Sequence, residues 1–268
     1  MFELIDTHCH LTSEDFATDL DQVLQAAGDA GVGRIVIPGV DLESSRRAIE
    51  LSQSHPLLFA AVGVQPEFST GYSHEHFAEF EKLARMEKVV AIGEIGLDFH
   101  YPPVDAELQQ SVMNEMLELA EKVRKPVLVH SRDAMGSVLS ILADWINRLD
   151  AASLSKLAAA PGIMHAFEGN LNQAEEAIRM GFALGVGGPV TYKNAVLKRN
   201  VFEAIGLQHL VLETDSPYLP PHPYRGERNE PAHLKEVALK LSEILNQPLE
   251  TVALKTTFCA KRIFGWIA

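Results

Sequence analysis

The sequence of 268 residues is poor in cysteine and has no long apolar run. Its two cysteines, Cys9 and Cys259, cannot build the disulfide framework of a small secreted domain. No stretch approaches the roughly 18 uncharged apolar residues that span a bilayer. The N-terminus also has no basic segment followed by an apolar run and a cleavage site. We therefore expect a cytoplasmic protein without a membrane segment.

Positive charge is also scarce, since 23 lysines and arginines face 36 aspartates and glutamates, a formal net charge of -13. Proteins that coat nucleic acid neutralise many phosphates with a basic surface, and this composition argues against that class. An anionic substrate would have to be held locally, by bound metal cations or by a few arginines at a pocket mouth.

What the sequence does contain is apolar residues, 47% of the total, in a regular alternation of short runs and amphipathic segments. Eight strand-like runs, most of them followed by a helical segment, are typical of a (β/α)8 TIM barrel with C-terminal helices. No linker, low-complexity tract or further repeat divides the chain, so a single domain over residues 1–268 is predicted. The expected strands are residues 2–10, 34–40, 57–66, 88–98, 125–132, 162–169, 182–188 and 210–219. The expected helices include residues 19–30, 44–53, 76–86, 106–122, 172–180, 231–245 and 248–264.

Polar side chains interrupt these apolar runs where the strands end. In such barrels the catalytic groups sit at the carboxyl ends of the strands, so these side chains are expected to face one mouth. Imidazole nitrogens and carboxylate oxygens suit zinc, manganese or another divalent ion. Any one of them alone is compatible with an ordinary hydrogen bond, but six at the same end of five strands favour a metal site. The candidate ligands are His8, His10, Glu94, His130, His165 and Asp215.

Six ligands exceed the need of one tetrahedral ion, which points to two divalent ions joined by a bridging group. No lysine near Glu94 offers a carboxylated bridge, so Glu94 is expected to bridge. The predicted first ion has His8, His10, Glu94 and Asp215 as ligands, and the second has Glu94, His130 and His165.

At these residues the sequence resembles the TatD family of metal-dependent deoxyribonucleases, a branch of the amidohydrolase-like barrels. The matching motifs are IDTHCHL at 5–11, GEIGLD at 93–98, PVLVHSR at 126–132, HAFEG at 165–169, LETDSPYL at 212–219 and RNEP at 228–231. The resemblance implies a (β/α)8 fold, dependence on divalent metal (Zn, Mg or Mn), phosphodiester hydrolysis of DNA and the ligand set above. Two positions depart from the family pattern, Thr12 in place of an acidic residue and Gln65 in place of a histidine.

The catalytic residues predicted are Glu94, as the bridge, and Asp215, as the group that orients water and accepts its proton. Arg132 is a candidate phosphate ligand because it lies two residues after His130 on the same strand. Arg228 in the proline-rich loop after the eighth strand is a second candidate for substrate contact. An ion-paired or surface role is the alternative for both arginines.

Three functions stay open on this basis. The first is a two-metal nuclease that acts on strand ends or short single strands of DNA, as a monomer without an obligate protein partner. The second is a metal-dependent hydrolase of another small ester, amide or phosphoester, such as aminoacyl-tRNA. The third is a metal-holding or scaffold protein that has lost catalysis, which an intact ligand set disfavours.

Overall fold

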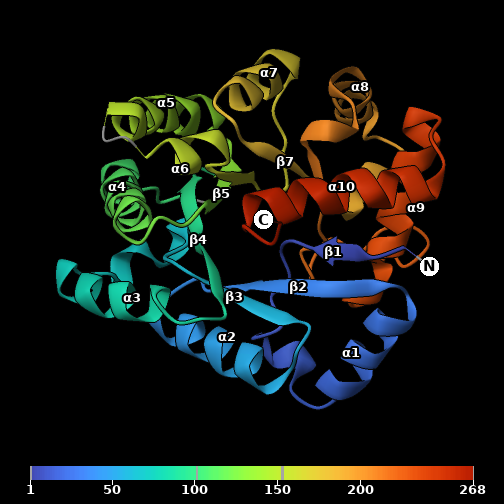
Figure 1. Cartoon of the computed structure of the whole chain (residues 1–268), viewed down its shortest axis with the longest axis horizontal. Coiled ribbons are helices and arrows are strands. Elements are labelled where there is room, and N and C mark those ends of the chain that lie inside the picture. The colour runs from blue at the N-terminus through green and yellow to red at the C-terminus, as the bar shows by residue number, and fades with distance from the viewer. Residues whose placement is uncertain (1, 101, 152–153, 268) are drawn as a thin grey trace.

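The structure is a computed structural model that describes residues 2–100, 102–151 and 154–267. Its strands form one parallel sheet in which each strand pairs with the next along the chain. The amide of Thr7 donates to the carbonyl oxygen of Leu212 (3.0 Å), so the last strand meets the first and the sheet closes. The predicted TIM barrel is confirmed (Figure 1). The strands are β1 (Leu4–Asp6), β2 (Val32–Pro38), β3 (Leu58–Val62), β4 (Val89–Asp98), β5 (Val127–Arg132), β6 (Gly162–Met164), β7 (Ala183–Val186) and β8 (Leu210–Leu212).

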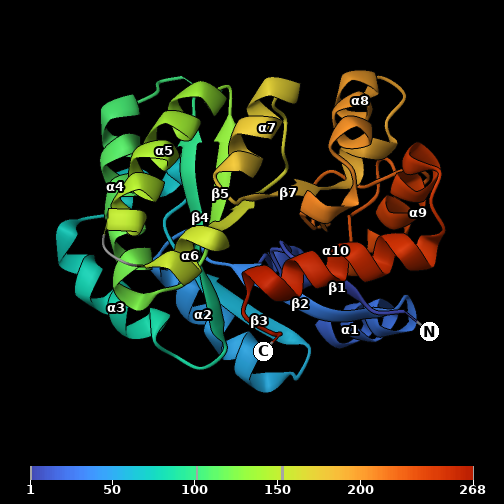
Figure 2. The same ribbon diagram turned by 45° about the horizontal axis from the view of Figure 1, so that its top comes forward.

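The helices surround the barrel, as Figures 1 and 2 show, and α5 and α8 are two that the sequence analysis did not single out. The larger apolar core lies between strands and helices, where, for example, the fully buried Trp145 of α5 packs near Phe182. No helix among the described residues is long and apolar enough to cross a membrane. The helices are α1 (Leu20–Asp29), α2 (Leu42–Ser54), α3 (Phe77–Ala84), α4 (Ala106–Val123), α5 (Met135–Ala151), α6 (Ser155–Ala159), α7 (Leu171–Arg179), α8 (Val196–Ile205), α9 (Leu234–Leu245) and α10 (Leu249–Ile263).

The barrel interior is filled from every strand and from the C-terminal helix. One buried apolar residue of each strand joins an inner cluster, to which α10 adds Cys259, Ala260 and Ile263. Figure 1 shows α10 lying across the barrel, and Nζ of Lys261 pairs with the carboxylate of Glu3 (2.5 Å) at the start of the chain. The amino-terminal end of the barrel is therefore closed, and the opposite end is left for the site. The strand residues are Ile5, Val36, Ala61, Ala91, Leu128, Ile163, Ala183 and Val211.

Several strands are shorter than the sequence analysis predicts. β1 ends at Asp6, and β8 ends at Leu212. The residues that follow bond partly to neighbouring strands and partly to loops. The amide of Cys9 donates to the carbonyl of Val36 in β2 (3.1 Å), whereas the amide of His10 donates to the carbonyl of Ser216 after β8 (2.7 Å). His8 and His10 thus lie beyond the end of β1, and their Nε2 atoms are 3.1 Å apart, so both side chains face the same point. The division into a single domain over residues 1–268 stays a prediction.

Candidate metal centre

The loop after β1 and the loop after β8 are joined by backbone hydrogen bonds that place three of the candidate ligands. The amide of Asp215 donates to the carbonyl of His8 (2.9 Å), and the amide of His10 donates to the carbonyl of Ser216 (2.7 Å). Asp215 has a φ of 58°, in the left-handed region that aspartate tolerates better than most residues. These contacts hold the two histidines opposite the Asp215 carboxylate.

A first group of four side chains surrounds one point. Nε2 of His8 and Nε2 of His10 are 3.1 Å apart. Oε2 of Glu94 lies 3.4 Å from Nε2 of His8 and 3.7 Å from Nε2 of His10. Oδ1 of Asp215 lies 3.3 Å from Nε2 of His10. This is the set predicted for the first ion.

A second group forms on the other side of Glu94. Its Oε1 lies 2.8 Å from Nδ1 of His130. Glu94, His130 and His165 each offer a ligand atom, and these atoms lie within 4.8 Å of one another. His165 also faces the first group, since its Nε2 is 3.6 Å from Oδ1 of Asp215. The two oxygens of one carboxylate thus face two different sets of histidines.

These distances fit metal coordination. Ligand atoms about 2.1 Å from one ion lie roughly 3 to 3.5 Å from each other. Three of the distances in the first group fall in this range, and the other two are 3.7 and 4.0 Å. Two imidazole nitrogens and two carboxylate oxygens that converge in a buried site are the donors that divalent ions such as zinc or manganese take. The residues present therefore fit a divalent cation.

Two further carboxylates orient the histidines from behind. Oδ2 of Asp98, at the end of β4, lies 3.1 Å from Nε2 of His130, so Nδ1 of that ring faces Glu94. Oε2 of Glu213 lies 3.1 Å from Nδ1 of His165 and leaves its Nε2 free to face Asp215. Carboxylates in this position set the tautomer and basicity of metal-binding imidazoles. Asp98 was missed by the sequence analysis, although the aspartate of GEIGLD lies four residues after Glu94.

Small residues make room for this arrangement. Gly96 in β4 has a φ of 143°, and a Cβ at that position would lie 2.0 Å from the carbonyl oxygen of His130. In β7, a Cβ on Gly185 would lie 2.4 Å from Oε2 of Glu213. Gly96 therefore allows β5 to lie close against β4. Gly185 leaves room for the buried Glu213 carboxylate beside His165.

The site is electrostatically negative and buried. Burial lowers the pKa of His8 to about 4. Burial alone would raise the pKa of Glu94, but the nearby His8 and His130 hold it well below its usual value. Burial also opposes charge on His165, yet Glu213 and Asp215 raise the pKa of His165 to about 10. The carboxylates thus favour positive charge at the centre, which a cation would also supply.

Asp6 and Thr214 support the same loops from below. The buried Asp6 carboxylate accepts hydrogen bonds from the amide of Thr214 (2.9 Å) and from its hydroxyl (2.6 Å). It also accepts one from the amide of His8 (3.3 Å). Asp6 therefore connects His8 to the segment that carries Asp215. Its carboxylate does not lie among the converging ligand atoms.

The two predicted substrate arginines lie in different surroundings. Arg132 ends β5 beside Asp98 in the sheet register. Burial alone would raise the pKa of Asp98, but the hydrogen bond with His130 lowers it, with a smaller contribution from the charge of Arg132. Arg228 donates to both carboxylate oxygens of Asp19 (3.0 and 2.7 Å) and to Glu230 (2.7 Å). Arg228 thus links the loop after β8 to the segment before α1. Its contact with substrate stays a prediction.

Gln65, one of the departures from the family pattern, is almost fully buried. Its side-chain oxygen accepts a hydrogen bond from the amide of Glu67 (2.9 Å) and caps the short 3-10 helix η2 (Pro66–Gly71). The side chain therefore holds the loop after β3 in place from within.

Comparison with known proteins agrees with this geometry. The family model of the TatD related DNases matches residues 5–265. The chain belongs to the TatD family. It is 39% identical over 261 residues to the uncharacterized metal-dependent hydrolase YabD of Bacillus subtilis, covering 97% of this chain and 98% of that one. It is 32% identical to a protein of Erwinia tasmaniensis named 3'-5' ssDNA/RNA exonuclease TatD, covering 98% and 100% of the two chains.

A solved structure also supports membership of the TatD family. The crystal structure of YjjV, a TatD homologue from Escherichia coli, superposes with a TM-score of 0.90 at 32% identity, covering 98% of each chain. The resemblance drawn from the motifs is therefore confirmed, and the chain is a TatD-family metal-dependent hydrolase.

Proposed function

We propose that this protein is a divalent-metal-dependent nuclease that cleaves phosphodiester bonds in single-stranded nucleic acid by a two-ion mechanism. DNA is the substrate proposed. The observation that supports the proposal is that the two oxygens of the Glu94 carboxylate face different histidines. Its Oε2 faces His8 and His10, and its Oε1 faces His130. A carboxylate shared in this way joins two cations in many phosphodiester-cleaving sites.

The chain supplies the ligands, and two divalent ions, Zn, Mg or Mn, are the cofactors proposed. When bound, such ions lower the pKa of water and neutralise charge on the phosphate oxygens. Asp215, whose Oδ1 lies 3.3 Å from Nε2 of His10 and 3.6 Å from Nε2 of His165, is proposed to orient the attacking water molecule and accept its proton. Arg132, at the end of β5 beside the site, is proposed to bind a phosphate oxygen of the substrate.

The preference for single strands and strand ends rests on charge. With a net charge of -13, the surface repels an extended duplex, whereas a strand end needs contact only near the mouth. The name of the Erwinia tasmaniensis relative, an exonuclease of single-stranded DNA and RNA, supports the same substrate class. A monomer in the cytoplasm stays a prediction.

The test is a panel of substrates incubated with metal-loaded protein. We expect labelled single-stranded DNA to be shortened, and duplex DNA, aminoacyl esters and simple amides to react far more slowly. Chelator should abolish the reaction, and returning the metal should restore it. Preferred hydrolysis of an aminoacyl ester would favour a metal-dependent hydrolase of another small ester or amide. Inactivity on every substrate, in protein with full metal content, would favour a metal-holding or scaffold protein that has lost catalysis.

A further inference from the structure

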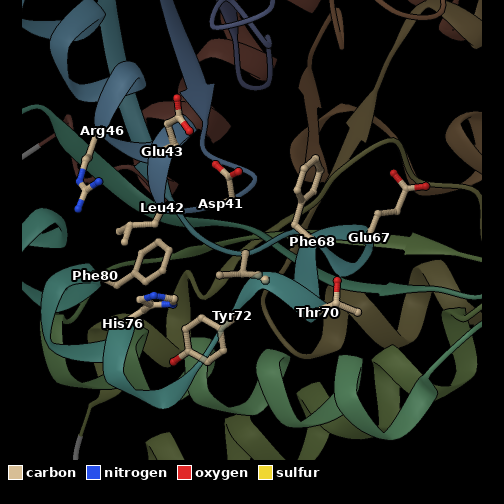
Figure 3. Close-up of a pocket in the computed structure, with 12 residues that line it drawn as sticks. Asp41, Leu42, Glu43, Arg46, Glu67, Phe68, Thr70, Tyr72, His76 and Phe80 are labelled. Atoms are coloured by element: carbon tan, nitrogen blue, oxygen red, sulfur yellow. The ribbon is translucent and has the colours of Figure 1, made fainter.

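Next to the metal centre lies a second feature that the proposed reaction does not use, a cavity of about 370 Å³ between the loops after β2 and β3. Its walls come from the start of α2, from η2 and from α3. Figure 3 shows Phe68 on one side of the cavity and Leu42, His76 and Phe80 on the other. Small-molecule sites in proteins often have this size.

The cavity is close to the metal centre. The carbonyl oxygen of Gly39 accepts a hydrogen bond from the amide of Glu94 (2.8 Å), and Asp41, which lines the cavity, is only two residues further along the chain. Two residues span at most about 7 Å. On the other side, Glu67 in the loop after β3 lines the cavity. The cavity therefore lies at the same end of the barrel as the metal centre, with one wall two residues from the hydrogen bond between Gly39 and Glu94.

The chemistry of the lining selects one part of a nucleotide. Phe68 is 43% exposed and lines the cavity, so it offers a ring face for stacking. The carboxylates of Asp41 and Glu43 stand over the cavity, and the charge of Arg46 is paired with Glu79. Acidic groups repel a phosphate, but they accept hydrogen bonds from exocyclic amino groups of bases.

We propose that this cavity binds the nucleobase next to the scissile phosphate, stacked on Phe68, with its amino group hydrogen-bonded to Asp41 or Glu43. This rests on the proposed nuclease function and adds a specificity to it. Cytosine, adenine and guanine carry an exocyclic amino group, and uracil and thymine do not. The enzyme should therefore prefer strands that place an amino-bearing base in the cavity.

The experiment compares oligodeoxycytidine with oligodeoxyuridine of equal length, whose bases differ at C4, where cytosine carries an amino group and uracil a carbonyl oxygen, and at N3, which carries a proton only in uracil. For the wild-type holoenzyme we expect kcat/KM about fivefold higher on the cytidine strand. The double variant Asp41→Asn with Glu43→Gln should lose this preference, while asparagine at position 41 retains the helix cap. The matched control for charge is Glu203→Gln on the exposed side of α8, which should keep the preference.

Stacking is tested by Phe68→Ala, for which we expect KM on both strands to rise about tenfold. Turnover of methyl p-nitrophenyl phosphate, which carries no base, should not change. Phe258→Ala on α10, which removes another half-exposed aromatic ring, is the matched control and should behave as wild type.

The two proposals fail in different ways. If the wild-type protein cleaves strands but shows no preference and Phe68→Ala has no effect, the base cavity is refuted and the nuclease function stands. An equal loss on methyl p-nitrophenyl phosphate would show that Phe68 only supports the metal centre, which also refutes the cavity. If Phe68→Ala slows a phenylalanine ester and not the strands, the cavity binds amino acids instead. If no strand is cleaved at all, the nuclease function itself is wrong.

Discussion

Oδ2 of Asp98 lies 3.1 Å from Nε2 of His130, while Nδ1 of the same ring lies 2.8 Å from Oε1 of Glu94. The backbone of Asp98 is itself fixed, because its amide and carbonyl bond to the side chain of Gln109 in α4 (2.9 and 3.0 Å). The outer helix thus determines, through one aspartate, which nitrogen of His130 faces the site.

Asp98→Ala should weaken binding at the second ion. Without the carboxylate, the His130 ring loses the partner that fixes its orientation and basicity, and metal affinity should fall about 10- to 100-fold. Titration against a fluorescent chelator measures this change. Asp133→Ala, which removes a mostly exposed carboxylate that pairs with His100, is the control. Equal affinity in the two variants would show that Asp98 has no positioning role.

Glu94→Gln should reduce the number of ions bound. A neutral amide bridges two cations poorly, so elemental analysis after dialysis should find about one ion fewer per chain than in the wild type. Circular dichroism should show that the variant is folded. Full occupancy of both positions would contradict the bridging role.

Asp215→Asn should separate catalysis from binding. The amide is similar in size but cannot accept a proton, so kcat should fall about 100-fold or more while KM changes little. Asp144→Asn, on the exposed side of α5, should leave both constants unchanged. Wild-type kcat in metal-loaded Asp215→Asn would rule out its role as proton acceptor.

Metal should stabilise the folded chain, because the ligands come together only in the folded barrel. At a metal concentration about a hundred times the dissociation constant, the free energy of unfolding should rise by about 2.7 kcal/mol. Calorimetry of metal-free protein with and without added Mn²⁺ or Zn²⁺ measures the shift in Tm. The shift should shrink in His8→Ala, and an equal shift in that variant would place the stabilising ion elsewhere.

Arg228→Ala should distinguish the two roles of this arginine. The loss of its partly exposed ion pairs with Asp19 and Glu230 should cost about 1 kcal/mol of stability in urea unfolding. Arg179→Ala, which removes a more exposed i,i+4 pair, should cost less. A KM that rises in Arg228→Ala without loss of stability would favour the substrate contact predicted from the sequence.

The sequence by itself determined the barrel and the residues around its mouth. Buried parallel strands read as apolar runs, and the polar residues that end those runs must face one end once the strands lie parallel. For this reason His8, Glu94 and Asp215 were identifiable although they are far apart in the chain. The order of the strands in the sheet followed from the same alternation.

Only the tertiary structure decided how these side chains are arranged around the metal centre and which residues hold them in position. His8 and His10 lie opposite Asp215 because the loop after β1 bonds to the loop after β8 through the amides of His10 and Asp215. The position of Asp98 behind His130, the pairing of Arg228 and the cavity beside Phe68 all depend on contacts between loops distant in sequence. Local periodicity carries no information about such contacts, since loop conformation is set by the packing of the elements that the loops connect.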